Sequence, residues 1–182
     1  MAKIKIKLDP GASMPTRATD GSVGYDVKSV KLYLIHDDGA ETICETPEQI
    51  KSTWYNNRIS YFKIDTGIHV TPEDGYYVEL VPNSRQGKTS LRWNASIGVI
   101  DPDYTGSIKI MVSTTLNECN PNDLAKLLPG NVVGQLIIRP KIDAEWEVTN
   151  KLDETQRGDC GFGSTEKPVI GSEDWYNDRC NF

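Results

Sequence analysis

Residues 98–106, with the sequence GVIDPDYTG, place two carboxylates and a tyrosine in one turn directly after three apolar residues. A carboxylate held on a turn can take a proton from a water molecule, and a tyrosine ring offers a flat face to a ligand. Aspartate and proline are also common turn formers, and Tyr104 could simply cover the core. Taken alone, this segment leaves both interpretations open.

Residues 157–165, with the sequence RGDCGFGST, form a second candidate site. Arg157 supplies a planar charged fork for phosphate, and Phe162 supplies a face on which a base could stack. The glycines let the backbone approach a ligand closely, and their amides can face an anion. A flexible tail is the alternative, because glycine permits it equally.

Residues 82–90, with the sequence PNSRQGKTS, end in a Gly-Lys-Thr that imitates a P-loop. The P-loop pattern requires glycine at position 82, which is Pro82, and no strand–loop–long helix unit surrounds the segment. The sequence therefore excludes a P-loop NTPase. It retains a polar, cationic loop that could bind an anion.

The composition limits the classes of protein further. The 182 residues suit one domain, and no run approaches the roughly 18 apolar residues of a membrane span. The start of the chain alternates lysine with apolar residues, unlike a secretory signal. A net charge of −6, from 20 Lys and Arg against 26 Asp and Glu, disfavours nucleic-acid binding. We expect a cytoplasmic protein that binds neither membranes nor nucleic acids.

The four cysteines lie far apart and show no CxxC spacing, with only His36 and His69 beside them. This pattern disfavours a zinc site and is typical of reduced thiols in a cytosol. With two histidines in the chain, acid–base chemistry would rest on carboxylates.

Short strands separated by polar turns should position these residues. We expect extended segments over 3–8, 24–34, 60–70, 76–81, 98–100, 107–113, 132–139 and 146–148. A short helix is expected over 46–55, with a threonine cap and a proline at its first position, and 122–128 could make one more turn. Regularly spaced short strands favour an all-β barrel or jelly roll.

Five segments together resemble the trimeric dUTPase family and occur in the family's order. They are 23–27 (VGYDV), 84–87 (SRQG), 98–106 (GVIDPDYTG), 130–137 (GNVVGQLI) and 157–165 (RGDCGFGST). The third and fifth are the most specific. The resemblance implies hydrolysis of dUTP to dUMP and pyrophosphate with Mg²⁺. It also implies an all-β, distorted jelly-roll or β-clip barrel with one short helix. The chain would form a homotrimer, as a phage or bacterial member in the cytoplasm, or in the host cytoplasm if phage-encoded.

The resemblance also implies roles for individual residues. Asp101 falls on the carboxylate that activates the attacking water, Tyr104 on the aromatic under the deoxyribose, and Asp26 on an acid near water-mediated metal contacts. The other substrate-binding positions are Ser84, Arg85, Gln86, Gly87 and Gln135 for the phosphates, and Ser96, Gly98 and, across a hairpin, Lys109 for the uracil edge. In the family an arm closes over the triphosphate and the base of a neighbouring subunit. Its positions here are Arg157, Phe162, Gly163, Ser164 and Thr165.

The chain departs from the family pattern at several positions. The second motif has Gln86 where the family has serine, and the fourth has Val132 for arginine and Gly134 for alanine. Glu166 replaces a glycine after the fifth motif. These changes keep a second hypothesis open, a dUTPase-like regulatory protein that binds nucleotide with weak or no turnover. The related dCTP deaminase relies on a glutamate near the third motif, and residues 98–112 contain none.

The expected organisation is a β-barrel domain over 1–153 and a Gly-rich arm and tail over 154–182. Extra chain relative to the family lies at about 36–58. This insertion is either a decorated surface loop or an arm that binds a protein partner, and the tail is a further candidate for such contacts.

Overall fold

The computed structural model describes residues 2–56, 58–114 and 120–158. The chain divides into two compact units, residues 1–142 and 143–182. The first unit holds every helix and strand of the described residues. Residues 143–158 of the second unit form neither, so the strand expected over 146–148 is absent there.

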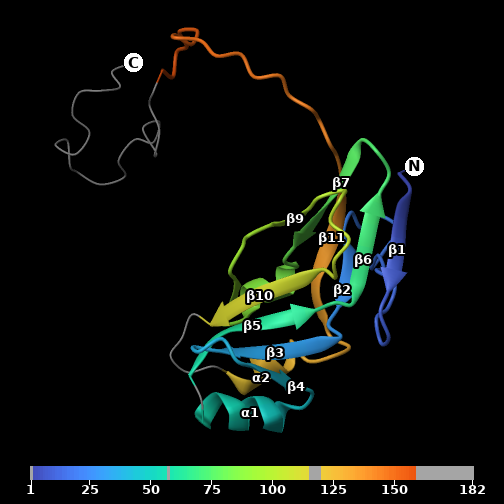
Figure 1. Cartoon of the computed structure of the whole chain (residues 1–182), viewed down its shortest axis with the longest axis vertical. Helices are drawn as coiled ribbons and strands as arrows, with labels where there is room; N and C mark the ends of the chain where they lie inside the picture. Colours follow the sequence, from blue (N-terminus) through green and yellow to red (C-terminus); the bar gives the residue numbers. More distant parts are fainter. Residues whose placement is uncertain (1, 57, 115–119, 159–182) are drawn as a thin grey trace, which may run out of the picture. The chain divides into compact units, whose positions relative to one another are not determined.

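Three antiparallel sheets make up the first unit (Figure 1). The two-stranded sheet pairs β1 (Ile4–Leu8) with β6 (Ile68–Pro72). The four-stranded sheet has the order β2 (Tyr25–Lys28), β11 (Val132–Pro140), β7 (Tyr76–Val81) and β9 (Gly98–Ile100). The five-stranded sheet has the order β4 (Glu41–Cys44), β3 (Lys31–His36), β5 (Ile59–Asp65), β10 (Lys109–Thr114) and β8 (Leu91–Trp93).

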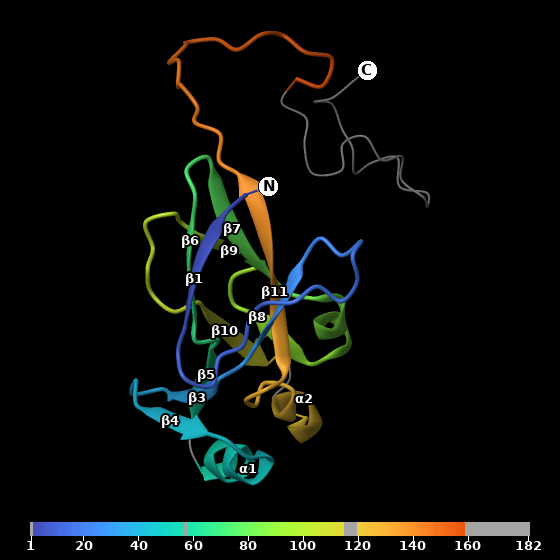
Figure 2. The ribbon, with the colours of Figure 1, turned by 90° about the vertical axis from the view of Figure 1, so that its right-hand side faces the viewer.

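Three helical segments accompany the sheets: α1 (Pro47–Asn56), α2 (Pro121–Ala125) and the 3₁₀ turn η1 (Ser84–Lys88). A capping box fixes the start of α1. The Gln49 amide donates a hydrogen bond to the Thr46 hydroxyl, and the Thr46 amide donates to the Gln49 side-chain oxygen. Both views place α1 and α2 at the same end of the sheets, where α1 also contacts β4 (Figures 1 and 2). The mostly β architecture with a short helix is as expected.

The segment 60–70 was expected to be extended throughout, and the structure divides it between two sheets. β5 belongs to the five-stranded sheet and β6 pairs with β1. Gly67 breaks the run, because its φ of 61° lies in the left-handed region that glycine adopts readily. The Thr66 hydroxyl donates to the carbonyl of Ile108 at 2.8 Å, which holds the break against the chain entering β10.

One hydrophobic core joins all three sheets and both α-helices. Its largest fully buried side chains include Phe62, Leu32, Leu34, Ile50, Ile64 and Leu127. The insertion 36–58 contributes to this core rather than forming a separate loop. β4 extends the five-stranded sheet, Ile50 of α1 is 2% exposed, and Trp54 stacks on Phe62 with ring centroids 5.5 Å apart.

Cys44, at the end of β4, is a buried free thiol, and burial raises its pKa. The other three cysteines lie outside the described residues. Among the helices that the structure describes, none has the length and apolar character needed to cross a membrane.

Candidate active site

The strand β11 brings three of the sequence motifs together. It lies between β2 and β7, so that Gln135 is opposite both Asp26 of the first motif and Val81, which leads into the second. The Gln135 side chain covers Gly24, where any Cβ would overlap it, and its amide nitrogen lies 3.5 Å from the Pro82 carbonyl oxygen. A larger residue at position 24 would therefore displace the Gln135 side chain.

The phosphate-binding candidates of the second motif lie on η1, which is capped by Asn83. The Asn83 side chain accepts a hydrogen bond from the Arg85 amide at 3.2 Å. Ser84, Arg85 and Gly87 are exposed, so a ligand can reach them. Gln86 points elsewhere, because its side-chain amide donates to the backbone carbonyl of Val133 at 2.8 Å. The departure from the family's serine thus supplies a bond between the second and fourth motifs.

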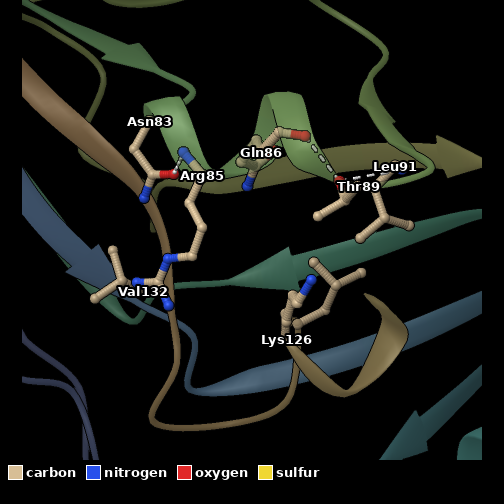
Figure 3. A pocket seen from close by; sticks show the side chains of 8 residues that line it. Asn83, Arg85, Gln86, Thr89, Leu91, Lys126 and Val132 are labelled. Carbon is tan, nitrogen blue, oxygen red and sulfur yellow. Dashed lines mark hydrogen bonds between the residues drawn. The ribbon is translucent and has the colours of Figure 1, made fainter. Parts of the chain in front are cut away.

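A small hollow opens beside η1 and has a volume of about 20 Å³. Its polar and cationic lining comes from Asn83, Arg85 and Gln86 on one side and Lys126, beyond α2, on the other. Figure 3 shows Arg85 extending from η1 toward Val132, with Lys126 on another wall. A space of this size holds about one water molecule, so a triphosphate would lie against its rim and not inside it.

An acidic residue that the sequence analysis did not single out anchors the chain after η1. Asp123 of α2 is 6% exposed and accepts hydrogen bonds from the amide and hydroxyl of Ser90, at 2.9 and 3.0 Å. Lys126 donates to the other carboxylate oxygen at 2.8 Å. The bond from Lys126 is the largest cause that holds the pKa of Asp123 below its usual value, with the Ser90 bonds adding to it.

The third motif forms a tight turn after β9. The Tyr104 amide donates to the Asp101 carbonyl at 3.0 Å, and the Tyr104 hydroxyl donates to the Ser107 carbonyl at 3.0 Å. Asp101 is exposed, and Tyr104 keeps 44% of its surface exposed. The ring covers Gly106, where a Cβ would overlap it. A carboxylate and an aromatic face are therefore presented to solvent from one fixed turn.

The chain from β8 to β10 closes as a hairpin at its base, where these two strands pair antiparallel and the Asn94 amide donates to the Met111 carbonyl at 2.9 Å. β9 pairs with β7 in the four-stranded sheet, whereas β10, which begins at Lys109, pairs with β5 and β8. The Lys109 ammonium lies 3.4 Å from the carboxylate of Asp65, its partner in the β5 register. Ser96 is exposed, in the bend between β8 and β9, and Gly98 is half-buried at the start of β9, on a different sheet from Lys109.

The donor set for a metal ion is small. Asp26, on β2, is half-buried and its amide donates to the Thr16 carbonyl at 2.7 Å. No group of three histidine, cysteine or carboxylate side chains suited to a metal occurs in the described ranges. A carboxylate beside the predicted phosphate-binding residues fits Mg²⁺, which keeps several waters and binds through one or two carboxylates and substrate phosphates.

The fifth motif is only partly described. Arg157 is exposed in the second unit. Phe162, Gly163, Ser164 and Thr165 lie outside the described residues.

The fourth-motif glycine has a local explanation. A Cβ on Gly134 would lie 2.8 Å from the Trp93 ring of β8 and 3.1 Å from the Val81 carbonyl oxygen. The indole occupies the space that the family's alanine would need. The family residue at 134 and the tryptophan at 93 are therefore not compatible in this packing.

Known proteins resemble this chain over most of its length. A family model described as dUTPase matches residues 53–166. Among curated relatives, the deoxyuridine 5'-triphosphate nucleotidohydrolase of Helicobacter pylori is 31% identical over 168 residues, covering 90% of this chain and 96% of its own. The enzyme of the same name from Fusobacterium nucleatum is 27% identical over 173 residues, which cover 92% of this chain and 100% of the relative. The chain belongs to the dUTPase family.

Solved phage structures have the same fold. The dUTPase of Staphylococcus bacteriophage 80alpha with dUPNHPP superposes with a TM-score of 0.65 at 21% identity, covering 91% of this chain and 99% of that one. A mutant dUTPase from phage phi11 of S. aureus, described as coordinating a structural Mg(II) ion, superposes with a TM-score of 0.60 at 19% identity. The match covers 84% of this chain and 99% of that one.

Proposed function

We propose that this protein hydrolyses dUTP to dUMP and pyrophosphate. The observation that supports this most is the meeting of three dUTPase motifs at Gln135, which covers Gly24 and approaches the Pro82 carbonyl just before η1. Relatives that carry the name deoxyuridine 5'-triphosphate nucleotidohydrolase over nearly their whole length support the same reaction.

Asp101 is the proposed general base. Its exposed carboxylate, at the start of the turn, can accept a proton from a water molecule. The water oxygen forms a new bond to phosphorus, the bridging bond between the α and β phosphates breaks, and pyrophosphate leaves with the electron pair. A carboxylate suffices for this proton transfer, so no histidine is required.

The remaining described candidates would hold the substrate. Tyr104 presents its half-exposed ring to the deoxyribose. The backbone near Ser96 and Gly98 would read the uracil edge, where fixed donors and acceptors reject the reversed pattern of cytosine. Lys109 would reach the base from the neighbouring sheet. The phosphates would lie on η1 and beside β11, against Ser84, Arg85, Gln86, Gly87 and Gln135.

Mg²⁺ is the proposed cofactor, held through water by Asp26. The position of Asp26 opposite Gln135 supports this, because it puts the carboxylate strand beside the proposed phosphate site. When bound, the ion offsets the negative charge of the triphosphate.

The C-terminal arm and the homotrimer are the remaining parts of the proposed site. We place the globular domain at 1–153, with its insertion 36–58, and an arm at 154–182 that closes over the site of a neighbouring subunit in a homotrimer. Arg157, Phe162, Gly163, Ser164 and Thr165 would contact the triphosphate and the base. A Gly-rich arm that orders over the substrate would exclude water from the reacting phosphate. We place the protein in the cytoplasm.

A nucleotide-binding regulatory protein with weak turnover is the second candidate. The hydrogen bond from Gln86 to Val133 favours it, because the side chain that replaces the family's serine is engaged within the protein. The exposed surface of the insertion, or the tail, would then contact a protein partner.

Pyrophosphate release from dUTP, dCTP, dTTP and UTP, with Mg²⁺ present and the base of each product identified, separates these functions. Release from dUTP alone supports the proposed hydrolysis. Conversion of dCTP to a uracil product would instead indicate a deaminase. Tight dUTP binding without release would support the regulatory protein.

A further inference from the structure

His69 connects two parts of the first unit that lie far apart in the sequence. It lies on β6, directly opposite Lys7 of β1. Its Nδ1 is 2.8 Å from the carbonyl oxygen of Thr105, and its Nε2 is 3.0 Å from a carboxylate oxygen of Asp9. The side chain is 18% exposed. Thr105 belongs to the turn that presents Asp101 and Tyr104.

Both partners of the imidazole ring are hydrogen-bond acceptors. A neutral imidazole has one N–H and can donate to only one of them, whereas the protonated ring donates to both. The bond to the Thr105 carbonyl, and next the bond to Asp9, raise the pKa of His69. The bond from His69 is the largest cause that lowers the pKa of Asp9. Lys7 acts in the opposite direction on His69, and its ammonium lies 3.4 Å from the other oxygen of Asp9.

The far end of the same turn is fixed by other contacts. The Ser107 hydroxyl donates to Asp65, and the Ile108 amide donates to the Ile68 carbonyl at 2.9 Å. Asp65 also accepts a hydrogen bond from the Gly67 amide at 2.9 Å. Contacts to β5 and β6 therefore fix the C-terminal end of the turn, at Ser107 and Ile108. His69 fixes a second point, at Thr105, one residue after Tyr104.

We infer that His69, oriented by Asp9, is a positioning residue for dUTP hydrolysis: it fixes the Thr105 carbonyl and thereby the turn that carries Asp101 and Tyr104. This role rests on the proposed function. Asp9, His69 and Thr105 lie outside the substrate-binding set, so the effect is transmitted through the backbone of the turn. The protonated His69 ring donates hydrogen bonds to both the Thr105 carbonyl and Asp9. Deprotonation leaves one N–H on the ring, so one of these two hydrogen bonds is lost.

The kinetic test compares His69→Ala, His69→Asn and Asp9→Asn with the wild type. Small displacements of a reacting group can lower a rate by up to about 100-fold, so we expect His69→Ala to lower kcat for dUTP by about tenfold, with a smaller change in KM. His69→Asn keeps a donor near the Nδ1 position and should recover most of kcat. For the wild type we expect kcat to decline as the pH rises through the His69 pKa. His69→Asn should lack this decline, because asparagine does not titrate.

A matched control is the other histidine. His36 lies in the insertion, where its Nε2 is 2.8 Å from the Thr42 hydroxyl. His36→Asn should leave kcat and its pH dependence unchanged. Equal kcat values and pH profiles for wild type and His69→Ala would overturn the positioning role.

Proton NMR of the two histidine rings tests the His69–Asp9–Thr105 contact without reference to activity, with each signal assigned from the His36→Asn and His69→Asn variants. We expect the His69 signal to titrate above the ordinary histidine range, and Asp9→Asn to move that titration to lower pH. An ordinary titration that Asp9→Asn leaves in place would overturn the contact. Absence of dUTP turnover in the wild type would contradict the proposed function, and the histidine titration would still confirm or overturn the contact.

Discussion

The side-chain amide of Gln86 donates a hydrogen bond to the backbone carbonyl of Val133 at 2.8 Å, across 47 positions of sequence. This bond ties the 3₁₀ turn η1 to the start of β11. Both segments belong to the proposed phosphate site. A substitution in the second motif is therefore coupled to the geometry of the fourth.

Removing this bond tests the coupling. Gln86→Ala should lower the free energy of unfolding by about 1 kcal/mol, the usual net contribution of a hydrogen bond, and raise KM for dUTP as η1 loosens. Urea unfolding and steady-state kinetics measure the two effects. Lys88→Ala, on an exposed residue of the same turn, is the control for stability and should change it little. An unchanged unfolding curve for Gln86→Ala would contradict the coupling.

Gly134→Ala restores the residue of the family pattern, yet we expect it to destabilise the protein. The new methyl group would lie 2.8 Å from the Trp93 ring, and such overpacking costs about 1–3 kcal/mol. Thermal unfolding and tryptophan fluorescence would report the displacement of the indole.

Two controls accompany this change. Gly21→Ala has nothing within 4 Å of the new Cβ and should be neutral or slightly stabilising. Trp93→Leu should relieve the Gly134→Ala penalty in the double variant. A Gly134→Ala protein as stable as the wild type would show that the indole moves freely.

The insertion is predicted to be required for folding. Ile50→Ala removes a side chain that is 2% exposed and should cost about 2–5 kcal/mol in unfolding free energy. Lys51→Ala, on the adjacent exposed position of α1, should leave stability nearly unchanged. Equal denaturation curves for the two variants would instead identify α1 as a decoration on the fold.

Asp123 gives a prediction for the pH dependence of stability. The pKa of Asp123 is lowered in the folded protein. Its ionised carboxylate therefore stabilises the fold at pH values above its pKa in the unfolded chain, and this stabilisation is lost as the pH falls through its pKa in the folded protein. Asp123→Asn should therefore be less stable than wild type at pH 7, and the difference should shrink in acid. Asp20→Asn, in an exposed turn, is the control. A difference that persists unchanged at low pH would contradict this account.

Features set by neighbouring residues were predictable from the sequence. The 46–55 helix follows from its threonine cap and proline, and the strands at β7, β9 and β11 follow from β-branched runs between turns. The Asp101–Tyr104 turn is likewise local. The expectation of one extended segment over 60–70 failed because Gly67, which lies within that run, takes a positive φ.

Contacts between distant segments were not predictable. The bonds of Gln86 to Val133, Asp123 to Ser90 and His69 to Thr105 join residues 47, 33 and 36 positions apart. Each depends on the order of strands in the sheets, which periodicity does not give. The placement of β9 and β10 in different sheets was unpredictable for the same reason.

The most direct test of the central claim compares wild type with Asp101→Asn in a single-turnover measurement of pyrophosphate release from dUTP with Mg²⁺, alongside calorimetric binding of a non-hydrolysable dUTP analogue. A general base contributes roughly 10²–10⁴-fold, so the account predicts a loss of that size with nearly unchanged binding. Asp103→Asn, the neighbouring carboxylate of the same turn, should remain active. An Asp101→Asn protein that keeps more than about a tenth of the wild-type rate would contradict the claim that Asp101 is the base.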